Sequence, residues 1–350
     1  MSIIHSVTTS FPESYVSQET ISEEISNIWP DKKKHVEQFH TSSQVLGRHL
    51  SIPLADYKNL GDIGERSRIW LDVALDLQVR NITKLLSAAG LTPADISLIA
   101  STTVTGLAIP TLEARIMNKL AFKPNTKRLP IFGLGCLGGV AGINRMNDYL
   151  LGHPKEAVLL LATELCSLTF QFQDKSVANL VGTSLFSDGA AAVLLLGDQH
   201  PLAKKGQFRI LDGQSFFYPD TERIMGWDIV ASGFQIVLSG DVPKIVVDHV
   251  KPNLTEFLSN NKMAPNDINF VVSHPGGPKV LDKLSEITER SPEDFKHSWM
   301  SLREKGNMSS VSVLHVMEKT ISDKRQSNEF GLMVAMGPAF CSEMCLIRKI

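Results

Sequence analysis

The chain contains few cysteines, and their spacing excludes two common kinds of structural support. Only four occur in 350 residues, Cys136, Cys166, Cys341 and Cys345, and no two of them form a Cys-x-x-Cys pair. Disulfide frameworks and structural zinc sites both depend on several closely spaced cysteines. We therefore expect free thiols, no metal ion and the reducing environment of the cytoplasm.

The sequence also lacks an excess of charge and a long apolar run. Lys and Arg number 35 and Asp and Glu 37, so the net charge of -2 gives no reason to expect nucleic acid or an anionic membrane as a partner. The longest apolar run, around Val158 to Ala162, is far shorter than the roughly 20 residues that span a bilayer. The N-terminal residues do not have the pattern of a signal peptide. We expect small molecules or proteins as partners, no membrane span and a cytoplasmic location.

Apolar runs typical of buried strands alternate with amphipathic stretches typical of helices. The runs cover residues 96–102, 128–132 and 157–163, and the helical stretches cover residues 112–121 and the segment after Cys136. This alternation is typical of an α/β fold. A chain of 350 residues is long enough for roughly two domains of about 150 residues each.

One segment of the chain recurs without a gap. Residues 81–102, NITKLLSAAGLTPADISLIAST, align with residues 253–274, NLTEFLSNNKMAPNDINFVVSH. Each copy reads as a helix end, a turn that contains proline, and a buried strand. The spacing is too long for a solenoid repeat and indicates a duplicated half-protein, with chance similarity as the alternative. We place the halves at residues 1–200 and 201–350, and His274 ends the second copy.

Cys136 lies between a strand and a helix, in the segment GLGCLGG. The positive end of a helix favours a thiolate over a thiol, and the glycines allow a tight turn close to a substrate. A reactive cysteine is the favoured interpretation, and a small buried side chain is the plain alternative. A second alternative takes Gly133, Gly135 and Gly138 as a dinucleotide fingerprint with Glu164 as the ribose ligand, although a lone match of this kind is weak.

Two further segments contain candidate partners for the cysteine. The segment SHPGGP places His274 at the end of a predicted strand, before a turn that is rich in glycine and proline. The segment GNMSSVS places Asn307 just ahead of a predicted helix, where it would also serve as a capping residue. Taken alone, the histidine is as easily structural as functional.

The three segments GLGCLGG, SHPGGP and GNMSSVS, in this order and spacing, resemble those of the type III polyketide synthases, the chalcone synthase-like family. The likeness continues through nearly the whole chain, including residues 101–116, 162–171, 180–197, 233–243 and 335–340. The segments GLGC, ELCSLTFQ and MGWDIVASGF are most similar to bacterial synthases of alkylpyrones and alkylresorcinols. The resemblance implies an α/β thiolase-like fold with two pseudo-duplicated halves in layered αβαβα architecture.

The resemblance also implies a mechanism. Cys136 would hold the acyl starter, paired with His274 as an imidazolium, and His274 and Asn307 would donate hydrogen bonds to the thioester of malonyl-CoA as carbon dioxide leaves. The starter would be a medium-chain or long-chain fatty acyl-CoA, and the product an alkylpyrone or alkylresorcinol. Neither a metal nor a redox cofactor would be needed, because the coenzyme A thioesters are substrates.

The family pattern assigns further residues to the cavity and to a homodimer. Phe186 and Phe234 would be gatekeepers, and Ile109 would cross the dimer interface into the partner's cavity. The remaining pocket positions are Thr105, Cys166, Gly182, Ser309, Gly337 and Pro338.

Two positions depart from the family pattern. Ala339 replaces the last glycine of a Gly-Pro-Gly loop, and Ser42 stands where a coenzyme A-binding lysine is expected. Arg48 and Lys32 to Lys34 are weak substitutes for that lysine, because short charge runs are usually solvated.

Three other functions compete with this one. A β-ketoacyl carrier-protein synthase III-like enzyme would stop after one condensation. A catalytically silent homologue would act as a binding or scaffolding partner. A dehydrogenase would bind a nicotinamide cofactor at the glycine-rich turn.

Overall fold

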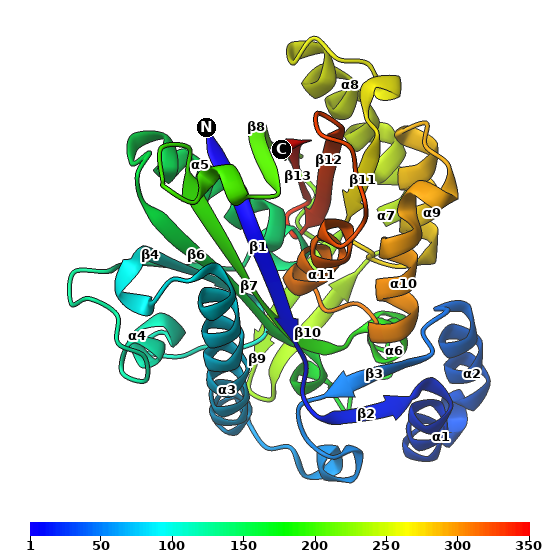
Figure 1. The fold of residues 1–350 in the computed structure, drawn as a ribbon. Coiled ribbons are helices and arrows are strands. Elements are labelled where there is room, and N and C mark those ends of the chain that lie inside the picture. Colours follow the sequence, from blue (N-terminus) through cyan, green and yellow to red (C-terminus); the bar gives the residue numbers. More distant parts are fainter.

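Nine strands form one mixed sheet that runs through the computed structural model, which describes residues 1–350 (Figure 1). The strand order is β11-β12-β13-β8-β1-β7-β6-β4-β5, and two small two-stranded sheets, β2-β3 and β9-β10, lie outside it. The strands are β1 (Ser2–Ser10), β2 (Ser14–Ser17), β3 (Gly47–Leu50), β4 (Ile96–Thr103), β5 (Lys127–Phe132), β6 (Ala157–Leu165), β7 (Asp188–Gly197), β8 (Phe208–Phe217), β9 (Met225–Val230), β10 (Gly233–Leu238), β11 (Phe270–Ser273), β12 (Phe330–Gly337) and β13 (Cys341–Lys349).

The two halves of the large sheet have the same topology. In the N-terminal half, β4 is parallel to β6, β6 is antiparallel to β7, and β7 is antiparallel to β1. In the C-terminal half, β11, β12, β13 and β8 repeat this order and these directions. The halves join where β1 pairs with β8. The predicted duplication is therefore confirmed, while the boundary at residue 200 stays a prediction.

The repeated segment folds alike in both halves. In the first copy Pro93 begins a short turn, and Asp95 accepts a hydrogen bond from the backbone N–H of Thr92 at 2.8 Å. In the second copy Asp267 accepts one from the N–H of Ala264, also at 2.8 Å. Each aspartate thus caps the turn that leads the chain into a buried strand, β4 or β11.

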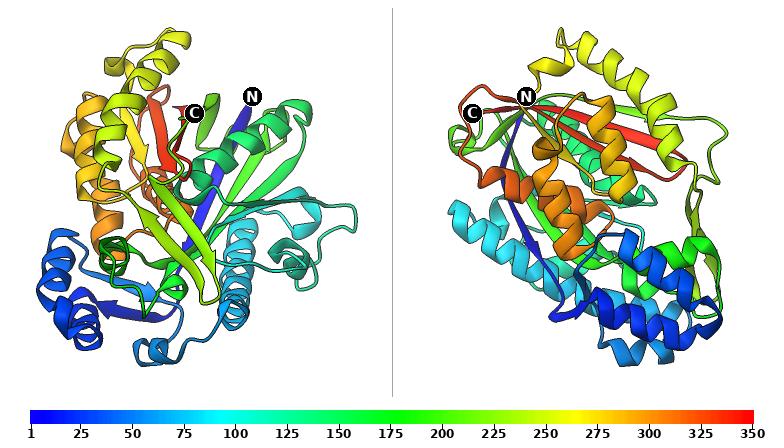
Figure 2. Two further views of the ribbon diagram at one scale, coloured as in Figure 1. Left: turned by 180° about the vertical axis from the view of Figure 1, so that it is seen from behind. Right: turned by 90° about the vertical axis from the view of Figure 1, so that its right-hand side faces the viewer.

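The helices lie on both outer faces of the sheet and between its halves (Figures 1 and 2). The α-helices are α1 (Gln18–Ile28), α2 (Lys33–Ser42), α3 (Ile63–Ala89), α4 (Leu112–Met117), α5 (Gly138–Gly152), α6 (Val177–Leu185), α7 (Val242–Ile245), α8 (Lys251–Asn260), α9 (Pro278–Ile287), α10 (Lys296–Lys305) and α11 (Ser310–Ile321). The shorter helical turns are η1 (Pro30–Lys32), η2 (Leu54–Asn59), η3 (Pro93–Asp95), η4 (Gly135–Leu137), η5 (Cys166–Thr169), η6 (Ala203–Lys205), η7 (Val246–Val250), η8 (Pro265–Asp267) and η9 (Pro292–Phe295).

Three large hydrophobic cores lie between the helices and the two half-sheets, which together form five layers. Side chains of α3 pack on the outer face of the N-terminal half-sheet, and side chains of η7, α8 and α9 pack on the outer face of the C-terminal half-sheet. Helices α5 and α11 share the central core with residues from both halves. This arrangement is the predicted layered αβαβα architecture. No helix combines the length and the hydrophobicity that a membrane crossing requires.

Small residues allow α5 and α11 to approach each other closely. A Cβ atom on Gly139 would lie 2.5 Å from the backbone oxygen of Ser310, and one on Gly138 would lie 2.5 Å from the hydroxyl oxygen of Thr102. Such contacts exclude any larger side chain at these two positions. The beginnings of the two helices therefore meet, which places the segment before α5 close to the segment before α11.

Candidate active site

The three predicted catalytic residues line one cavity of about 1580 Å³, measured with its open mouth. Cys136 lies in η4, between β5 and α5, and Asn307 lies between α10 and α11. His274 directly follows β11. The duplicated topology thus brings Cys136 together with His274 and Asn307, which are 138 and 171 positions away in the sequence.

Two glycines form the turn that carries Cys136. Gly133 and Gly135 have φ values of 93° and 53°, in the left-handed region that side chains rarely adopt. A Cβ atom on Gly135 would also lie 2.7 Å from the ring of Pro338. The turn is therefore tight and enclosed, and Cys136 is only 9% exposed.

His274 is buried with both ring nitrogens free of hydrogen-bond partners. Its backbone N–H donates to the carbonyl of Val334 at 2.9 Å, which continues the parallel pairing of β11 with β12 and fixes the residue at the strand end. Buried nitrogens without partners are costly and uncommon in folded proteins. The imidazole is therefore available to exchange hydrogen bonds with Cys136 or a bound substrate in the shared cavity.

Asn307 is held by its backbone and by its side-chain oxygen. Its N–H donates to Leu185 at 2.7 Å, and its carbonyl accepts from the N–H of Ser187 at 2.9 Å, so it pairs with the segment around Phe186. Its Oδ1 accepts from the N–H of Ser309 at 2.8 Å. Ser309 is itself the N-cap of α11, so Asn307 is not the capping residue that the sequence suggested as an alternative. Because the bond to Ser309 uses the amide oxygen, the side-chain N–H groups are left as donors. One of them donates to the carbonyl of Gly276 on the cavity wall at 3.3 Å.

Burial opposes a charge on either member of the cysteine–histidine pair. It raises the pKa of Cys136 to about 12, with the carboxyl of Glu164 acting in the same direction and a hydrogen bond from Ser309 against it. It lowers the pKa of His274 to about 3. Burial thus opposes the lowering of the cysteine pKa that we predicted for a helix N-terminus. Because burial opposes each charge when it forms alone, we expect the thiolate of Cys136 to form together with a protonated His274, which keeps the pair neutral overall.

Glu164 lies beside the catalytic cavity, although one interpretation of the sequence made it a ribose ligand. Its carboxyl group is fully buried and accepts hydrogen bonds from the Val104 N–H at 3.1 Å, the Thr105 hydroxyl at 2.9 Å, the Ser309 hydroxyl at 3.3 Å and the Ser310 hydroxyl at 2.7 Å. Burial raises its pKa to about 7, although these hydrogen bonds act against the rise. Such an enclosed carboxyl cannot reach a ribose, so the dinucleotide interpretation is wrong. The only sequence signal for its real place was its position near the end of a buried strand.

The predicted pocket residues divide among three neighbouring cavities. Phe186 lines both the catalytic cavity and a second, apolar pocket, to which Cys166 and Gly182 also belong. Phe234 lies instead in a third pocket. Four predicted residues remain. Ser309 and Pro338 line the catalytic cavity, and Gly337 packs against the backbone of Leu134 behind it. Thr105 lines none of the three cavities, because its buried hydroxyl is bonded to Glu164.

Arg48 lies in a place that does not suit phosphate binding. It is 2% exposed, and it donates to the carbonyl of Phe186 at 3.0 Å and to the side-chain oxygen of Gln18 at 2.7 Å. Its guanidinium therefore holds the segment of Phe186 in place. Ser42, by contrast, lies on the wall of the catalytic cavity as a neutral residue.

Ala339 has an unfavourable backbone conformation, and its replacement by glycine is expected to stabilise the protein. Its φ of 96° is unfavourable for any residue with a Cβ atom. Ala339→Gly should increase the free energy of unfolding by about 1 kcal/mol. The midpoint of thermal unfolding should then rise by about 2 °C. Ala335→Gly, in the buried part of β12, is the matched control and should lower the midpoint. A lower midpoint for both variants would contradict the argument.

The neutral pair predicts an unusual pH dependence for the alkylation of Cys136. With iodoacetamide, the rate should change little between about pH 6 and about pH 9, because proton transfer inside the pair does not depend on pH. In His274→Gln the thiolate must form by loss of the proton to solvent. Since burial raises the pKa of the cysteine, the rate should fall at neutral pH and then increase about tenfold per pH unit.

Mass spectrometry of the peptide that contains Cys136 measures this rate separately from the other cysteines. Cys341 is partly exposed, so its alkylation in the same samples is an internal reference that should increase with pH in both proteins. If the wild-type rate at Cys136 also increased tenfold per pH unit, His274 would not be the proton acceptor.

Comparisons with known proteins match nearly the whole chain. Residues 1–199 match the N-terminal domain of chalcone and stilbene synthases, and residues 210–350 match the C-terminal domain. The chain is 41% identical to a 1,3,6,8-tetrahydroxynaphthalene synthase of Streptomyces peucetius subsp. caesius, over 99% of this chain and 92% of that protein. It is 29% identical to a phloroglucinol synthase of Pseudomonas fluorescens, over 96% of each chain.

A solved structure has the same fold over its full length. The crystal structure of 1,3,6,8-tetrahydroxynaphthalene synthase from Streptomyces coelicolor, a bacterial type III polyketide synthase, superposes with a TM-score of 0.94. The match has 29% sequence identity and covers 99% of both chains. The family models, the relatives and the fold lead to one conclusion: this chain belongs to the chalcone and stilbene synthases, and it is a type III polyketide synthase.

Proposed function

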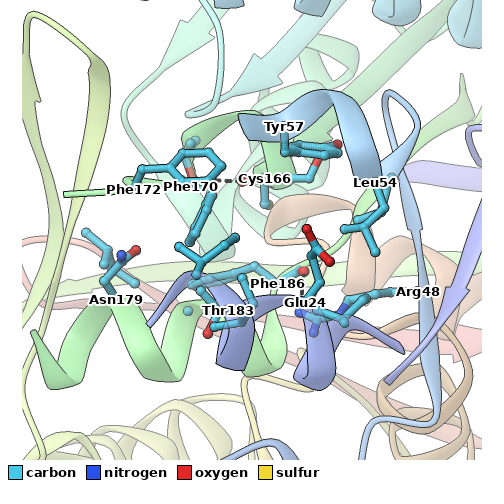
Figure 3. Close-up of a pocket in the computed structure, with 18 of the residues that line it drawn as sticks. Glu24, Arg48, Leu54, Tyr57, Cys166, Phe170, Phe172, Asn179, Thr183 and Phe186 are labelled. Atoms are coloured by element: carbon cyan, nitrogen blue, oxygen red, sulfur yellow. Dashed lines mark hydrogen bonds between the residues drawn. The ribbon is translucent and has the colours of Figure 1, made fainter. Parts of the chain in front are cut away.

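We propose that this enzyme condenses malonyl-CoA with a medium-chain or long-chain fatty acyl group held on Cys136, and that the product is an alkylpyrone or an alkylresorcinol. The observation that supports a fatty acyl starter is the apolar pocket on the far side of Phe186 from the catalytic cavity (Figure 3). An aliphatic chain attached to the cysteine has room there, outside the space in which malonyl units are added.

Twelve of the twenty residues that line this pocket are hydrophobic. Figure 3 shows the side chains of Leu54, Tyr57, Phe170 and Phe186 around the same space. Three of its residues, Phe186, Trp227 and Ile236, also line the catalytic cavity. Each methylene group that moves from water into such surroundings contributes about 0.8 kcal/mol, so the pocket favours a longer chain.

In the proposed reaction, the thiol proton of Cys136 passes to His274 as the sulfur attacks the acyl-CoA carbonyl. The departing coenzyme A thiolate then takes that proton from His274. Asn307 and the neutral His274 next donate hydrogen bonds to the thioester oxygen of malonyl-CoA and stabilise the enolate that forms as carbon dioxide leaves. The enolate carbon attacks the acyl group, the bond to the sulfur of Cys136 breaks, and the lengthened chain returns to the cysteine for the next round.

Two alternative products differ from this one in mass. The 41% identical relative is a tetrahydroxynaphthalene synthase, which favours a product built without a fatty starter. A single condensation, as in a β-ketoacyl carrier-protein synthase III, is the simpler chemical alternative. Product masses distinguish them: a tetrahydroxynaphthalene forms from malonyl-CoA alone, and one condensation adds only one two-carbon unit to the starter.

We also propose that the enzyme is a homodimer. Strand β5 is the edge of the large sheet, and most of its residues are exposed. Ile109, in the nearby loop, is 96% exposed, and Phe132 is 47% exposed. Exposed apolar side chains beside an unpaired strand edge are typical of a surface that another chain covers. The partner's Ile109 would then approach the third pocket, which Phe132 lines.

Filling the apolar pocket should shorten the accepted starter. A Cβ atom on Gly182 would lie at ordinary contact distances of 3.5 Å from Phe186 and 3.6 Å from Ile236, so Gly182→Val fits while it occupies the entrance. Wild-type enzyme with malonyl-CoA and acyl-CoAs of graded length should give masses for several malonyl additions. The variant should lose about tenfold or more in kcat/KM with long starters and little with short ones. Liquid chromatography with mass spectrometry measures both quantities.

The control for this experiment is Cys136→Ala, which should form no extended product with any starter. Undiminished product from Cys136→Ala would contradict the mechanism. An equal loss for short and long starters in Gly182→Val would contradict the assignment of the pocket. If wild-type enzyme gave a tetrahydroxynaphthalene and ignored acyl-CoAs, the fatty starter would be wrong while the family would stand.

The dimer has a test of its own. Ile109→Asp should reduce the mass in light scattering from twice 38.5 kDa to 38.5 kDa, because a carboxylate would be buried in the interface. Leu46→Asp introduces the same charge at another exposed apolar residue, beside β3, and should leave the mass unchanged. A wild-type mass of 38.5 kDa would refute the homodimer.

A further inference from the structure

The catalytic cavity has one fully charged side chain on its wall. Its 31 lining residues include no Asp, Glu or Arg, and Lys279 is the only lysine. The substrates of the proposed function carry several phosphate charges at the end opposite the reacting thioester. A single cation on an otherwise uncharged path is therefore the place where such a substrate gains its strongest electrostatic contact.

Lys279 lies at the outer end of this path. It is exposed, in the first turn of α9, whereas His274 is buried at the inner end of the same segment. Lys279 is five positions after His274 in the sequence, and an extended chain of that length reaches at most about 17 Å. The pantetheine arm of coenzyme A spans a distance of this order between its sulfur and its first phosphate.

The ammonium group of Lys279 is not neutralised by the protein. Lys279 takes part in none of the ion pairs of the structure. Two other lysines, by contrast, form ion pairs: Lys283 binds Glu286 at 2.6 Å, and Lys175 binds Asp31 at 2.6 Å. A free ammonium at the mouth of an active-site cavity is available to an anionic group of the substrate.

The opposite wall offers no competing cation. Ser42 and Phe39 face the cavity from α2, and the hydroxyl of Ser42 donates to the carbonyl of Phe39 at 3.1 Å. Of the cations that the sequence suggested for this role, Arg48 is buried against Phe186, and Lys32 to Lys34 do not line the cavity. We propose that Lys279 binds a phosphate group of the coenzyme A thioester at the mouth of the cavity. This inference rests on the proposed function, because it takes coenzyme A thioesters as the substrates.

The first experiment measures binding and does not depend on turnover. Isothermal titration calorimetry with coenzyme A on full-length protein should give a Kd about tenfold higher for Lys279→Glu than for wild type, and Lys279→Arg should restore most of the affinity. Lys244→Glu is the charge-matched control, because Lys244 is exposed beside Pro243 of the cavity wall without lining the cavity. Its Kd should stay within about twofold of wild type.

Dephospho-coenzyme A identifies the phosphate that is bound. If Lys279 contacts the 3′-phosphate, the difference between Lys279→Glu and wild type disappears with this ligand; if it contacts the diphosphate, the difference persists. Both results support the proposal. An unchanged Kd in Lys279→Glu, or an equal increase in Lys244→Glu, would overturn it.

Kinetics separate this inference from the proposed function. In Lys279→Glu, the KM for malonyl-CoA should increase about tenfold with little change in kcat, while the KM for malonyl-N-acetylcysteamine, which has no phosphate, should not change. An equal increase for both thioesters would overturn the phosphate contact. A wild-type enzyme that binds coenzyme A through Lys279 but forms no polyketide would refute the proposed product and leave the inference intact.

Discussion

The close contact between α5 and α11 is the constraint on which the active site depends. Because Gly139 packs against the backbone of Ser310, the two helices begin at nearly the same place between the half-sheets. Cys136 lies just before one helix, and Asn307 lies just before the other. The duplicated fold thus supplies two equivalent helix beginnings. One lies beside Cys136, the proposed nucleophile, and the other beside Asn307, the proposed hydrogen-bond donor.

A second constraint connects the catalytic amide with the wall between the two cavities. The backbone of Asn307 pairs with Leu185 and Ser187, and Arg48 donates to the carbonyl of Phe186, which lies between them. Phe186 cannot shift its backbone without breaking bonds that also position Asn307. In the proposed function, one connected segment would therefore govern both the size of the starter and the stabilisation of the enolate, and a change that widens the pocket through the backbone would also disturb catalysis.

The sequence predicted the α/β fold because its signals are local or repeated. The family resemblance singled out the three central residues, which the structure brings to one cavity. The strands at 96–102 and 157–163 were correct to within two residues, since apolar runs that are buried on both faces are easily recognised. Arg48 and Glu164 were not placed correctly, because nothing near them in the sequence shows that they are buried. Arg48 points inward to a carbonyl that is 138 residues away. All the residues that donate to Glu164 lie outside its own strand, 59 to 146 residues away in the sequence. Contacts of this range follow only from the assembled fold.

The polarity of the cavities changes from one end to the other. An apolar pocket lies beyond Phe186, a buried neutral pair of Cys136 and His274 lies in the middle, and an unpaired lysine lies at the mouth. Burial that disfavours a lone thiolate also protects an enolate from protonation by water, so the same low-dielectric surroundings serve both steps. A charged substrate end cannot enter this interior without a large desolvation cost. In the proposed reaction the charged end of the substrate would therefore remain at the mouth, where Lys279 lies, while the acyl chain occupies the uncharged interior.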